Sequence, residues 1–401
     1  MRRIYLDHNA TTPVDPEVFE AMRPYLTDQY GNASSIHGYG QMAKAAVEDA
    51  RECVAQLLNA QPGEIFFTSG GTESDNTAIF GAVEAARERK AGAAVHVITT
   101  SIEHHAVLHA AQAIEARGVR VTYVPVGIDG VIDAADVERA IAADTVLISV
   151  MHANNEIGTI QPVREIGRIA RERGITFHSD AVQSVGKIPV DVRAIGLDLL
   201  SLSAHKIEGP KGVGALYVRK GTVLRPLMYG GHHERDRRPG TENVPGIAGL
   251  GKAAELAAER MSADAARIAP LRDRLEAEIL RRLPRVKVNG SQSPRLPNTS
   301  SLMFENVDGE GLVIGCDLRG LACSTGAACS SGSLESSHVL TAIGLNRDQT
   351  RSTMRVSLGR TTTPEDVEAA IGVVVEVVER LRSLSPHEHG EATRVQSSTA
   401  R

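Results

Sequence analysis

The sequence lacks several features that would point to a specialised class of protein. It contains no tryptophan, and aromatic residues make up only 3% of it. No segment approaches the roughly 18 consecutive apolar residues of a membrane-spanning helix, and the start MRRIYLDHNATTPVD lacks the apolar core of a signal peptide. Lys and Arg number 44 against 49 Asp and Glu, a net charge of −5 without long runs of one sign. We therefore expect a cytoplasmic protein with neither a nucleic-acid groove nor a membrane-binding surface, whose partner is a small molecule or another protein.

Cysteine is scarce as well, with Cys53, Cys316, Cys323 and Cys329 in the whole chain. These are too few and too clustered for a disulfide framework, and a reducing cytosol would keep them as thiols. We expect any role of these thiols to be chemical or to be packing. Histidine pairs occur at positions 104/105, 232/233 and 387/389, but without further ligands at fixed spacing they do not indicate a metal site.

The order of apolar and polar residues predicts an α/β protein. At about 150 residues per domain, the chain corresponds to two or three domains. Between residues 41 and 220, helical patterns alternate with short apolar runs such as VLISV, which is typical of a largely parallel sheet covered by helices on both faces. Ligands of such sheets bind beyond the carboxyl ends of the strands. We expect helices at residues 41–59, 74–90, 103–117, 134–142 and 163–173, and strands at residues 64–68, 95–99, 119–126, 145–150, 175–178, 199–203 and 215–218.

The pattern changes after about residue 225. The segment RPLMYGGHHERDRRPGTEN is polar and punctuated by glycine and proline, and a long helical pattern at residues 245–283 follows it. A second α+β unit is predicted next, with strands in VKVNG, NTSSLMFE and STMRVSLGR and helices at residues 309–318 and 364–383. The tail SPHEHGEATRVQSSTAR is polar, and we expect it to be disordered.

Chemically reactive residues follow two of the predicted strands. Asp180 comes after the strand at residues 175–178, and Lys206 comes after the strand at residues 199–203. Each residue alone is usually a loop residue or a surface charge. Their joint placement instead favours a site for pyridoxal phosphate (PLP), in which a lysine forms a Schiff base and a carboxylate keeps the ring nitrogen protonated.

The phosphate of such a cofactor needs a further feature, and the motif SGGTESDN supplies one. Gly70 and Gly71 let the backbone approach an anion, and the amides of the helix that opens with Thr72 and Glu73 attract it.

Two other glycine-rich motifs resemble nucleotide-binding motifs only in their sequence letters. GLGKAA, which begins at Gly249, follows no predicted strand and favours helix packing over dinucleotide binding. GPKGVG lacks the Gly-Lys-Ser/Thr of a phosphate loop and indicates a turn.

Two downstream residues are candidates for contact with a substrate. Cys329 lies in CSTGAACSSGS, a run of small residues. It is either an incidental cysteine in a linker or a thiol that reaches a cofactor as a nucleophile. Arg355 lies on the predicted strand MRVSLGR, where it either forms a surface ion pair or binds a substrate carboxylate through two hydrogen bonds.

Taken in order, these motifs resemble those of a known enzyme family. The cysteine desulfurases of the NifS/IscS group, within the class V aminotransferase superfamily, have motifs similar to YLDHNATT, SGGTESDN, EHHAVL, MHANNEIGT, HSDAVQSVGK, SLSAHKIEGPKGVGALY, GGHHERDRRPGTEN and the Cys329 loop with SLESSHVL. The resemblance extends from Tyr5 to about Ser385.

The resemblance implies the PLP-dependent transferase fold type I, which is an α/β fold. A large domain at residues 16–258 would hold a mostly parallel seven-stranded sheet covered by helices. A smaller α+β domain would combine residues 1–15 and 259–385 and carry the cysteine loop, and residues 386–401 would be a polar tail. The resemblance also implies a cytoplasmic homodimer with PLP as cofactor, L-cysteine as substrate and no metal in the isolated protein.

The same resemblance implies a role for each candidate residue. Lys206 would form the Schiff base, His104 would stack on the ring and help to move protons, and Cys329 would carry the persulfide. Asn155 and Arg355 would hold the substrate carboxylate. Cofactor contacts are implied for Gly71, Thr72, His104, Asn155, Asp180, Gln183, Ser203, His205, Lys206 and Thr241. In particular, Asp180 would pair with the ring nitrogen and Gln183 with the phenolic oxygen, and Thr241 would reach the phosphate of the neighbouring subunit.

The implied activity is conversion of L-cysteine to L-alanine with the sulfur left as a persulfide on Cys329. The persulfide would pass to an iron–sulfur scaffold protein of the NifU/IscU type or to another acceptor. Alternatives are another PLP enzyme of the same fold, such as an aminotransferase or a selenocysteine lyase, and a catalytically silent sulfur carrier. The sequence departs from the family at Cys323, where serine is usual. That thiol either pairs with Cys329 or is a small loop residue, which we favour.

Overall fold

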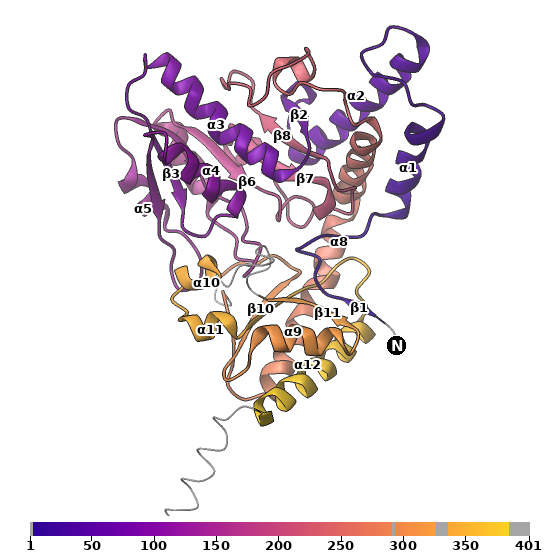
Figure 1. Ribbon diagram of the computed structural model, residues 1–401, viewed down its shortest axis with the longest axis vertical. Coiled ribbons are helices and arrows are strands. Elements are labelled where there is room, and N and C mark those ends of the chain that lie inside the picture. Colours follow the sequence, from indigo (N-terminus) through magenta and orange to yellow (C-terminus); the bar gives the residue numbers. More distant parts are fainter. Residues whose placement is uncertain (1–2, 291–292, 326–335, 385–401) are drawn as a thin grey trace, which may run out of the picture.

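The computed structural model describes residues 3–290, 293–325 and 336–384, and Figure 1 shows a large α/β unit joined to a smaller one. The described part of the large unit contains a seven-stranded sheet of order β2-β8-β7-β6-β5-β3-β4. Its strands are β2 (Ile65–Thr68), β3 (His96–Thr100), β4 (Arg120–Val124), β5 (Thr145–Ser149), β6 (Thr176–Asp180), β7 (Leu199–Ser203) and β8 (Gly214–Val218). Strand β8 runs antiparallel to β2 and β7, and the other neighbours are parallel. The predicted mostly parallel sheet is therefore confirmed.

Helices cover both faces of this sheet. Side chains alternate between the two faces of a strand, so Leu199 of β7 packs into one apolar core and Leu200 into another. A strand that is apolar throughout needs cover on both sides. The helices of the large unit are α1 (Pro16–Thr27), α2 (Gly38–Leu58), α3 (Gly71–Arg89), α4 (His105–Glu115), α5 (Ala134–Ala140), α6 (Val163–Glu172) and α7 (Val192–Ile195).

Helix α1 was not among the predicted elements. It begins at Pro16, which suits the first turn of a helix because its missing N–H would have no partner there. Asp15 caps this end by accepting a hydrogen bond from the backbone N–H of Glu17 at 2.8 Å. The sequence signal for helix α1 was therefore its N-terminal cap, Asp15 followed by Pro16, and not a long periodic pattern of apolar residues.

Helix α8 (Val244–Arg282) links the two units (Figure 1). The helix predicted at residues 245–283 is confirmed to within one residue at each end. Its first part packs against α1 and α2, where a Cβ on Gly251 would lie 2.5 Å from Cα of Ala50 and one on Gly249 would lie 2.8 Å from the Met22 side chain. The interpretation of GLGKAA as a helix-packing motif is confirmed by these close approaches.

The small unit has its own apolar core, which includes Leu302 and Val356. Its strands are β9 (Val286–Val288), β10 (Thr299–Phe304), β12 (Ser324–Thr325) and β13 (Thr353–Ser357), all in one antiparallel sheet, and the pair β1 (Ile4–Tyr5) and β11 (Leu321–Ala322). Its helices are α9 (Gly309–Asp317), α10 (His338–Ala342), α11 (Arg347–Arg351) and α12 (Pro364–Leu384). Because β1 pairs with β11, the N-terminal strand belongs to the same unit as the C-terminal helix α12. This supports the proposed division into residues 16–258 and residues 1–15 with 259–385, whose boundaries stay predictions. The predicted disordered tail at residues 386–401 lies outside the described residues.

Candidate active site

An open cavity of about 800 Å³ lies at the carboxyl ends of β6 and β7. Side chains that follow neighbouring parallel strands meet at this edge of a sheet. Among the described residues, every residue predicted for the site lines the cavity except Thr241, and Cys329 lies outside the described residues. The predicted residues that line it are Gly71, Thr72, His104, Asn155, Asp180, Gln183, Ser203, His205, Lys206 and Arg355.

The glycine-rich turn before α3 forms one end of the cavity. Gly70 has φ +151° and ψ −174°, a backbone conformation that only glycine adopts readily. A Cβ on Gly71 would lie 2.7 Å from Cγ2 of Val182. Because Gly70 has no side chain that would cap α3, the positive end of the helix is open to an anion. The hydroxyls of Thr72 and Ser203 belong to the same cavity, so this end suits a phosphate group.

Lys206 lies in the short 3-10 turn η2 (Ala204–Lys206) that follows β7. Its Nζ donates hydrogen bonds to the backbone carbonyls of Asn9 and Ala10, the second at 2.8 Å. His205 precedes it, and burial together with the charge of Lys206 lowers the pKa of His205 to about 4. Lys206 is therefore held at the cavity by the N-terminal segment, next to a histidine that is neutral at pH 7.

Asp180, the last residue of β6, is 5% exposed. Its Oδ1 accepts a hydrogen bond from the backbone N–H of Val182 at 2.9 Å. Burial raises the pKa of Asp180 to about 6, against the opposing effects of that hydrogen bond and of Lys206. Asp75 of α3 is also buried, and burial together with the charge of Asp180 raises the pKa of Asp75 well above its ordinary value. A cationic group against Asp180 would stabilise its ionised form.

His104 caps helix α4, since its Nδ1 accepts a hydrogen bond from the backbone N–H of Ala106 at 3.2 Å. This cap explains why the helix predicted from residue 103 begins at His105. Burial, with the charge of Lys206, lowers the pKa of His104 to about 4. The ring is therefore neutral at pH 7, with Nδ1 as acceptor and the proton on Nε2.

Arg355 of β13 is only 1% exposed, so the ion pair that it forms is buried and not at the surface as one alternative expected. Its Nη2 donates to Oδ1 of Asp7 at 2.8 Å, and its Nη1 donates to the backbone carbonyl of Asn155 at 3.1 Å. Within the described residues, its buried Nε has no hydrogen-bond partner. A guanidinium carries five N–H donors, so donors remain for a carboxylate in the cavity.

Several residues of the cavity were not predicted: Asn9, Ala10, Asp75, Met151, Ala153 and Val182. Asn9 is central among them. Its Nδ2 donates to the carbonyl of Asn155 at 3.1 Å, and its own carbonyl accepts from Gln183 Nε2 at 3.0 Å and from Lys206. The sequence signal that could have identified Asn9 was the motif YLDHNATT. This motif contributed to the family resemblance, but none of its residues was assigned to the site.

Two predicted site residues are absent from the described cavity. Thr241 is exposed and lies shortly before α8, so its implied role in a neighbouring subunit stays a prediction. Cys329 lies outside the described residues, but both flanking segments contact the site. Ser324 of β12 pairs with Arg355 of β13, and His338 Nε2 donates to the carbonyl of Glu103 at 2.8 Å. The described residues on one side of Cys329 thus contact the site residue Arg355, and those on the other side contact the neighbour of the site residue His104.

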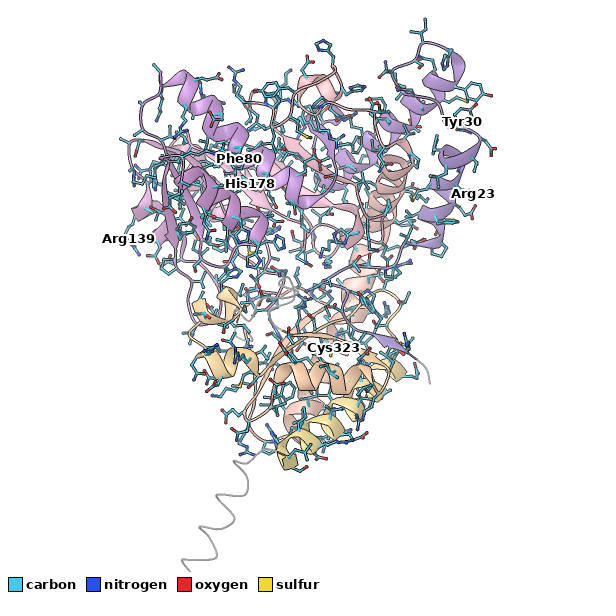
Figure 2. The ribbon with its side chains drawn as sticks, viewed as in Figure 1. Arg23, Tyr30, Phe80, Arg139, His178 and Cys323 are labelled. Atoms are coloured by element: carbon cyan, nitrogen blue, oxygen red, sulfur yellow. The ribbon has the colours of Figure 1, made fainter. Side chains whose placement is uncertain are left out.

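Cys323 is buried in the small unit, where Figure 2 labels it. A hydrogen bond with Cys316 and burial raise the pKa of Cys323, and its Sγ lies 3.5 Å from Sδ of Met354. A protonated thiol in an apolar core favours the packing role over a pairing with Cys329.

In residues 3–290, 293–325 and 336–384, no group of three or more His, Cys, Asp or Glu side chains is placed to hold a metal ion. No helix of these same segments is both long and apolar enough to cross a membrane.

Comparison with known proteins identifies the family of the chain. Residues 4–370 match the family model described as aminotransferase class-V. The cysteine desulfurase IscS of Methanosarcina thermophila is 51% identical over 385 residues, which cover 96% of this chain and 94% of that protein. Cysteine desulfurase 1 of Trichormus variabilis is 50% identical over 392 residues, which cover 98% of this chain and 97% of that protein.

Solved structures agree with these relatives. A NifS-like protein superimposes with a TM-score of 0.87 at 39% identity and covers 94% of this chain and 99% of its own. SspA, solved in complex with cysteine, superimposes with a TM-score of 0.78 at 39% identity and covers 90% of this chain and 100% of its own. The chain therefore belongs to the cysteine desulfurases of the NifS/IscS group, within the class V aminotransferase family.

Proposed function

We propose that the protein converts L-cysteine to L-alanine with PLP as cofactor and leaves the sulfur as a persulfide on Cys329. The observation that carries the proposal is the cavity, which combines Lys206, buried Asp180, the glycine-rich start of α3 and Arg355 in one space. An amine, an acid, an anion site and a guanidinium are the groups that PLP and an amino acid together require. Identity of about half with cysteine desulfurases over nearly the whole chain supports the same reaction.

The residues of the cavity fit PLP. Lys206 would bind the aldehyde, Asp180 the ring nitrogen and Gln183 the phenolic oxygen. Thr72, Ser203 and His205, with the start of α3, would bind the phosphate. Two observations support the fit: the start of α3 leaves no room for a Cβ at Gly71, since it would lie 2.7 Å from Cγ2 of Val182, and a cationic ring nitrogen against Asp180 would offset the burial that raises its pKa to about 6. When bound, PLP supplies an aldehyde that combines with amines and a ring that withdraws electrons from Cα.

Protein side chains then act on the substrate in order. Arg355 and Asn155 hold the carboxylate of cysteine, which fixes its Cα near Lys206. Lys206 removes the proton from Cα. His104 is neutral at pH 7 with a proton on Nε2, so it can donate a hydrogen bond from Nε2 to a reacting group while its ring bears no charge.

Sulfur transfer requires the thiolate of Cys329 to attack the substrate sulfur. The S–S bond of the persulfide forms as the Cβ–S bond of the substrate breaks, and the electron pair of that bond stays with the carbon skeleton. Cβ then takes up a proton, and Cα regains the proton that Lys206 removed, which gives alanine. The balance is one cysteine and one protein thiol giving one alanine and one persulfide. Ser324 pairs with Arg355, which lines the cavity, and His338 contacts Glu103, which precedes the cavity residue His104. These contacts near the cavity support delivery of Cys329 to it.

The proposal includes two partners. The persulfide would pass to an iron–sulfur scaffold protein of the NifU/IscU type or to another sulfur acceptor. A second copy of the chain would complete the site, with Thr241 reaching the phosphate bound by its neighbour. The exposure of Thr241 in a single chain is compatible with that role.

The decisive experiment compares Cys329→Ser with Cys323→Ser and Cys316→Ser. Loading of PLP and the change of its visible spectrum with cysteine require no protein thiol, whereas sulfur removal requires a nucleophile. Cys329→Ser should therefore respond spectrally to cysteine yet release almost no alanine, because a serine hydroxyl stays protonated near neutral pH. The buried Cys323 and Cys316 should be replaceable with most activity kept. Full turnover by Cys329→Ser, or a persulfide found by mass spectrometry chiefly on Cys323, would overturn the choice of nucleophile.

The same assay distinguishes the alternative functions. An aminotransferase would need a keto acid as acceptor and would release no sulfide, and a silent sulfur carrier would show no PLP band. Lys206→Ala should keep the fold but lose the visible band of the lysine-bound cofactor and the activity. A yellow and active Lys206→Ala protein would contradict the assignment of Lys206.

A further inference from the structure

Lys187 makes contacts that ordinary ion pairing does not explain. It is half-buried, and within the described residues both hydrogen bonds of its Nζ go to Gln183, to the backbone carbonyl at 3.0 Å and to side-chain Oε1 at 2.8 Å. No carboxylate of the described residues lies within ion-pair distance of it. Its charged neighbours are cations: burial and the charges of Lys206 and Arg355 lower the pKa of Lys187 to about 7. Placing a charged amine among cations lowers the stability of the folded protein. The position of Lys187 therefore needs an explanation other than ion pairing.

The contact with Gln183 decides which way its side-chain amide points. Oε1 accepts from Lys187, and Nε2 donates to the carbonyl of Asn9 at 3.0 Å. With the amide turned over, Nε2 would face the Nζ donors of Lys187 and Oε1 would face a carbonyl oxygen, and both contacts would be repulsive. An amide nitrogen has two N–H groups. One is used by Asn9, so the second remains for the active-site cavity that Gln183 lines.

We propose that Lys187 is a positioning residue that fixes the side-chain amide of Gln183 so that its N–H, not its oxygen, meets the phenolic oxygen of the cofactor. Lys187 does not itself line the active-site cavity in the described structure; it lines a neighbouring cavity of about 700 Å³ that Lys206 also borders. The inference rests on the proposed function, because it needs PLP with its phenolic oxygen at Gln183.

A double-mutant cycle on the full chain tests it, with PLP as the probe. Wild type, Lys187→Met, Gln183→Ala and the double variant are compared for the dissociation constant of PLP and for the pH midpoint of the colour change of the bound cofactor. Lys187→Met should bind PLP about tenfold more weakly, the scale of one hydrogen bond to a charged oxygen. Its midpoint should rise, because an oxygen that has lost a donor holds a proton more strongly.

The coupling between the two positions is the discriminating result. In the Gln183→Ala background, Lys187→Met should add less than a twofold further loss, because its effect passes through the amide. Lys287→Met, which removes an exposed lysine of the small unit, is the matched control and should match wild type. Additive losses, or a Lys187→Met protein that binds PLP like wild type, would overturn the inference. If the wild type itself bound no PLP, the proposed function would fail instead. Should Lys187→Met not fold, as judged by circular dichroism, Lys187→Gln replaces it in the same cycle.

Discussion

Arg355 shows how a single buried charge can be tolerated beside an active site. Burying a guanidinium is costly unless its charge is paired and its N–H groups find acceptors. Here Asp7 supplies the carboxylate and Asn155 a carbonyl. The same contacts tie the N-terminal segment to β13, so this residue serves the structure, and we propose that its remaining donors bind a substrate.

A first prediction separates these two roles of Arg355. Arg355→Ala should raise KM for cysteine and lower kcat/KM at least tenfold to a hundredfold, since a charge-assisted hydrogen-bonded pair contributes about 1.5–3 kcal/mol. Asp7→Asn keeps the guanidinium but weakens its ion pair, so it should lower the melting temperature with a smaller change in kcat/KM. Steady-state kinetics and thermal melts of both variants check this. Unchanged kcat/KM in Arg355→Ala would refute substrate binding by Arg355.

At the scale of elements, two helices approach each other at a glycine. A Cβ on Gly251 of α8 would lie 2.5 Å from the backbone of Ala50 in α2, a contact that backbone atoms cannot relieve without moving a helix. Gly372 of α12, in contrast, has open space around its missing Cβ. Both positions are helical, so they differ in packing and not in backbone preference.

The second prediction follows from that difference. Gly251→Ala should destabilise the protein by about 1–3 kcal/mol through overpacking. Gly372→Ala should stabilise it by about 0.5–1 kcal/mol, because alanine restricts the unfolded chain more than glycine does. Denaturant titrations of both variants provide the measurement. Equal effects at the two sites would show that the α2–α8 contact is not close in solution.

Strand β6 contains a titratable group at the centre of the sheet. His178 is fully buried, and its ring nitrogens lie 2.8 Å from Oγ of Ser149 and 3.0 Å from Oγ of Ser201. Figure 2 labels it within the large unit. Burial lowers the pKa of His178 to about 3, so the imidazole remains neutral in the folded sheet at neutral and mildly acidic pH.

The third prediction concerns pH. An unfolded histidine has a pKa of about 6.5, so below that pH the unfolded chain binds a proton that folded His178 does not. The stabilising contribution of a neutral His178 is fully present above pH 6.5 and is lost progressively as the pH falls toward 3. Between pH 7 and 5 the loss is about 2 kcal/mol. His178→Asn should lose that much less stability over the same interval, measured by urea unfolding at both pH values, whereas the exposed His232→Asn should behave like wild type.

At the scale of the whole molecule, the large unit presents exposed apolar side chains. Ile36 is 94% exposed, Tyr229 86% and Tyr30 71%, and Figure 2 labels Tyr30 at the edge of the unit. Apolar side chains of this size are the kind that association buries. They support the proposed homodimer, in which Thr241 completes the site of the neighbouring subunit.

The fourth prediction is that the active form is this dimer. Sedimentation at assay concentration should give twice the chain mass of 42.8 kDa, and Ile36→Asp should shift the equilibrium toward monomer with a parallel loss of PLP affinity. Leu318→Asp, which also replaces an exposed apolar residue but in the small unit, is the control. A fully active monomer would rule out a composite site.

The alternation of helices and strands and the chemistry at the strand ends could be read from the order of residues alone. Periodicity is local, and parallel strands must bring Asp180 and Lys206 to one edge, so both could be predicted before the structure. The contacts between distant segments became visible only in the folded chain. Asp7 and Arg355 are 348 positions apart, and Asn9 reaches Lys206 and Gln183, because folding brings the N-terminal segment against the cavity. The depressed pKa of His178 and the raised pKa of Asp75 likewise depend on burial, which is a property of the assembled core and has no signature in the local sequence.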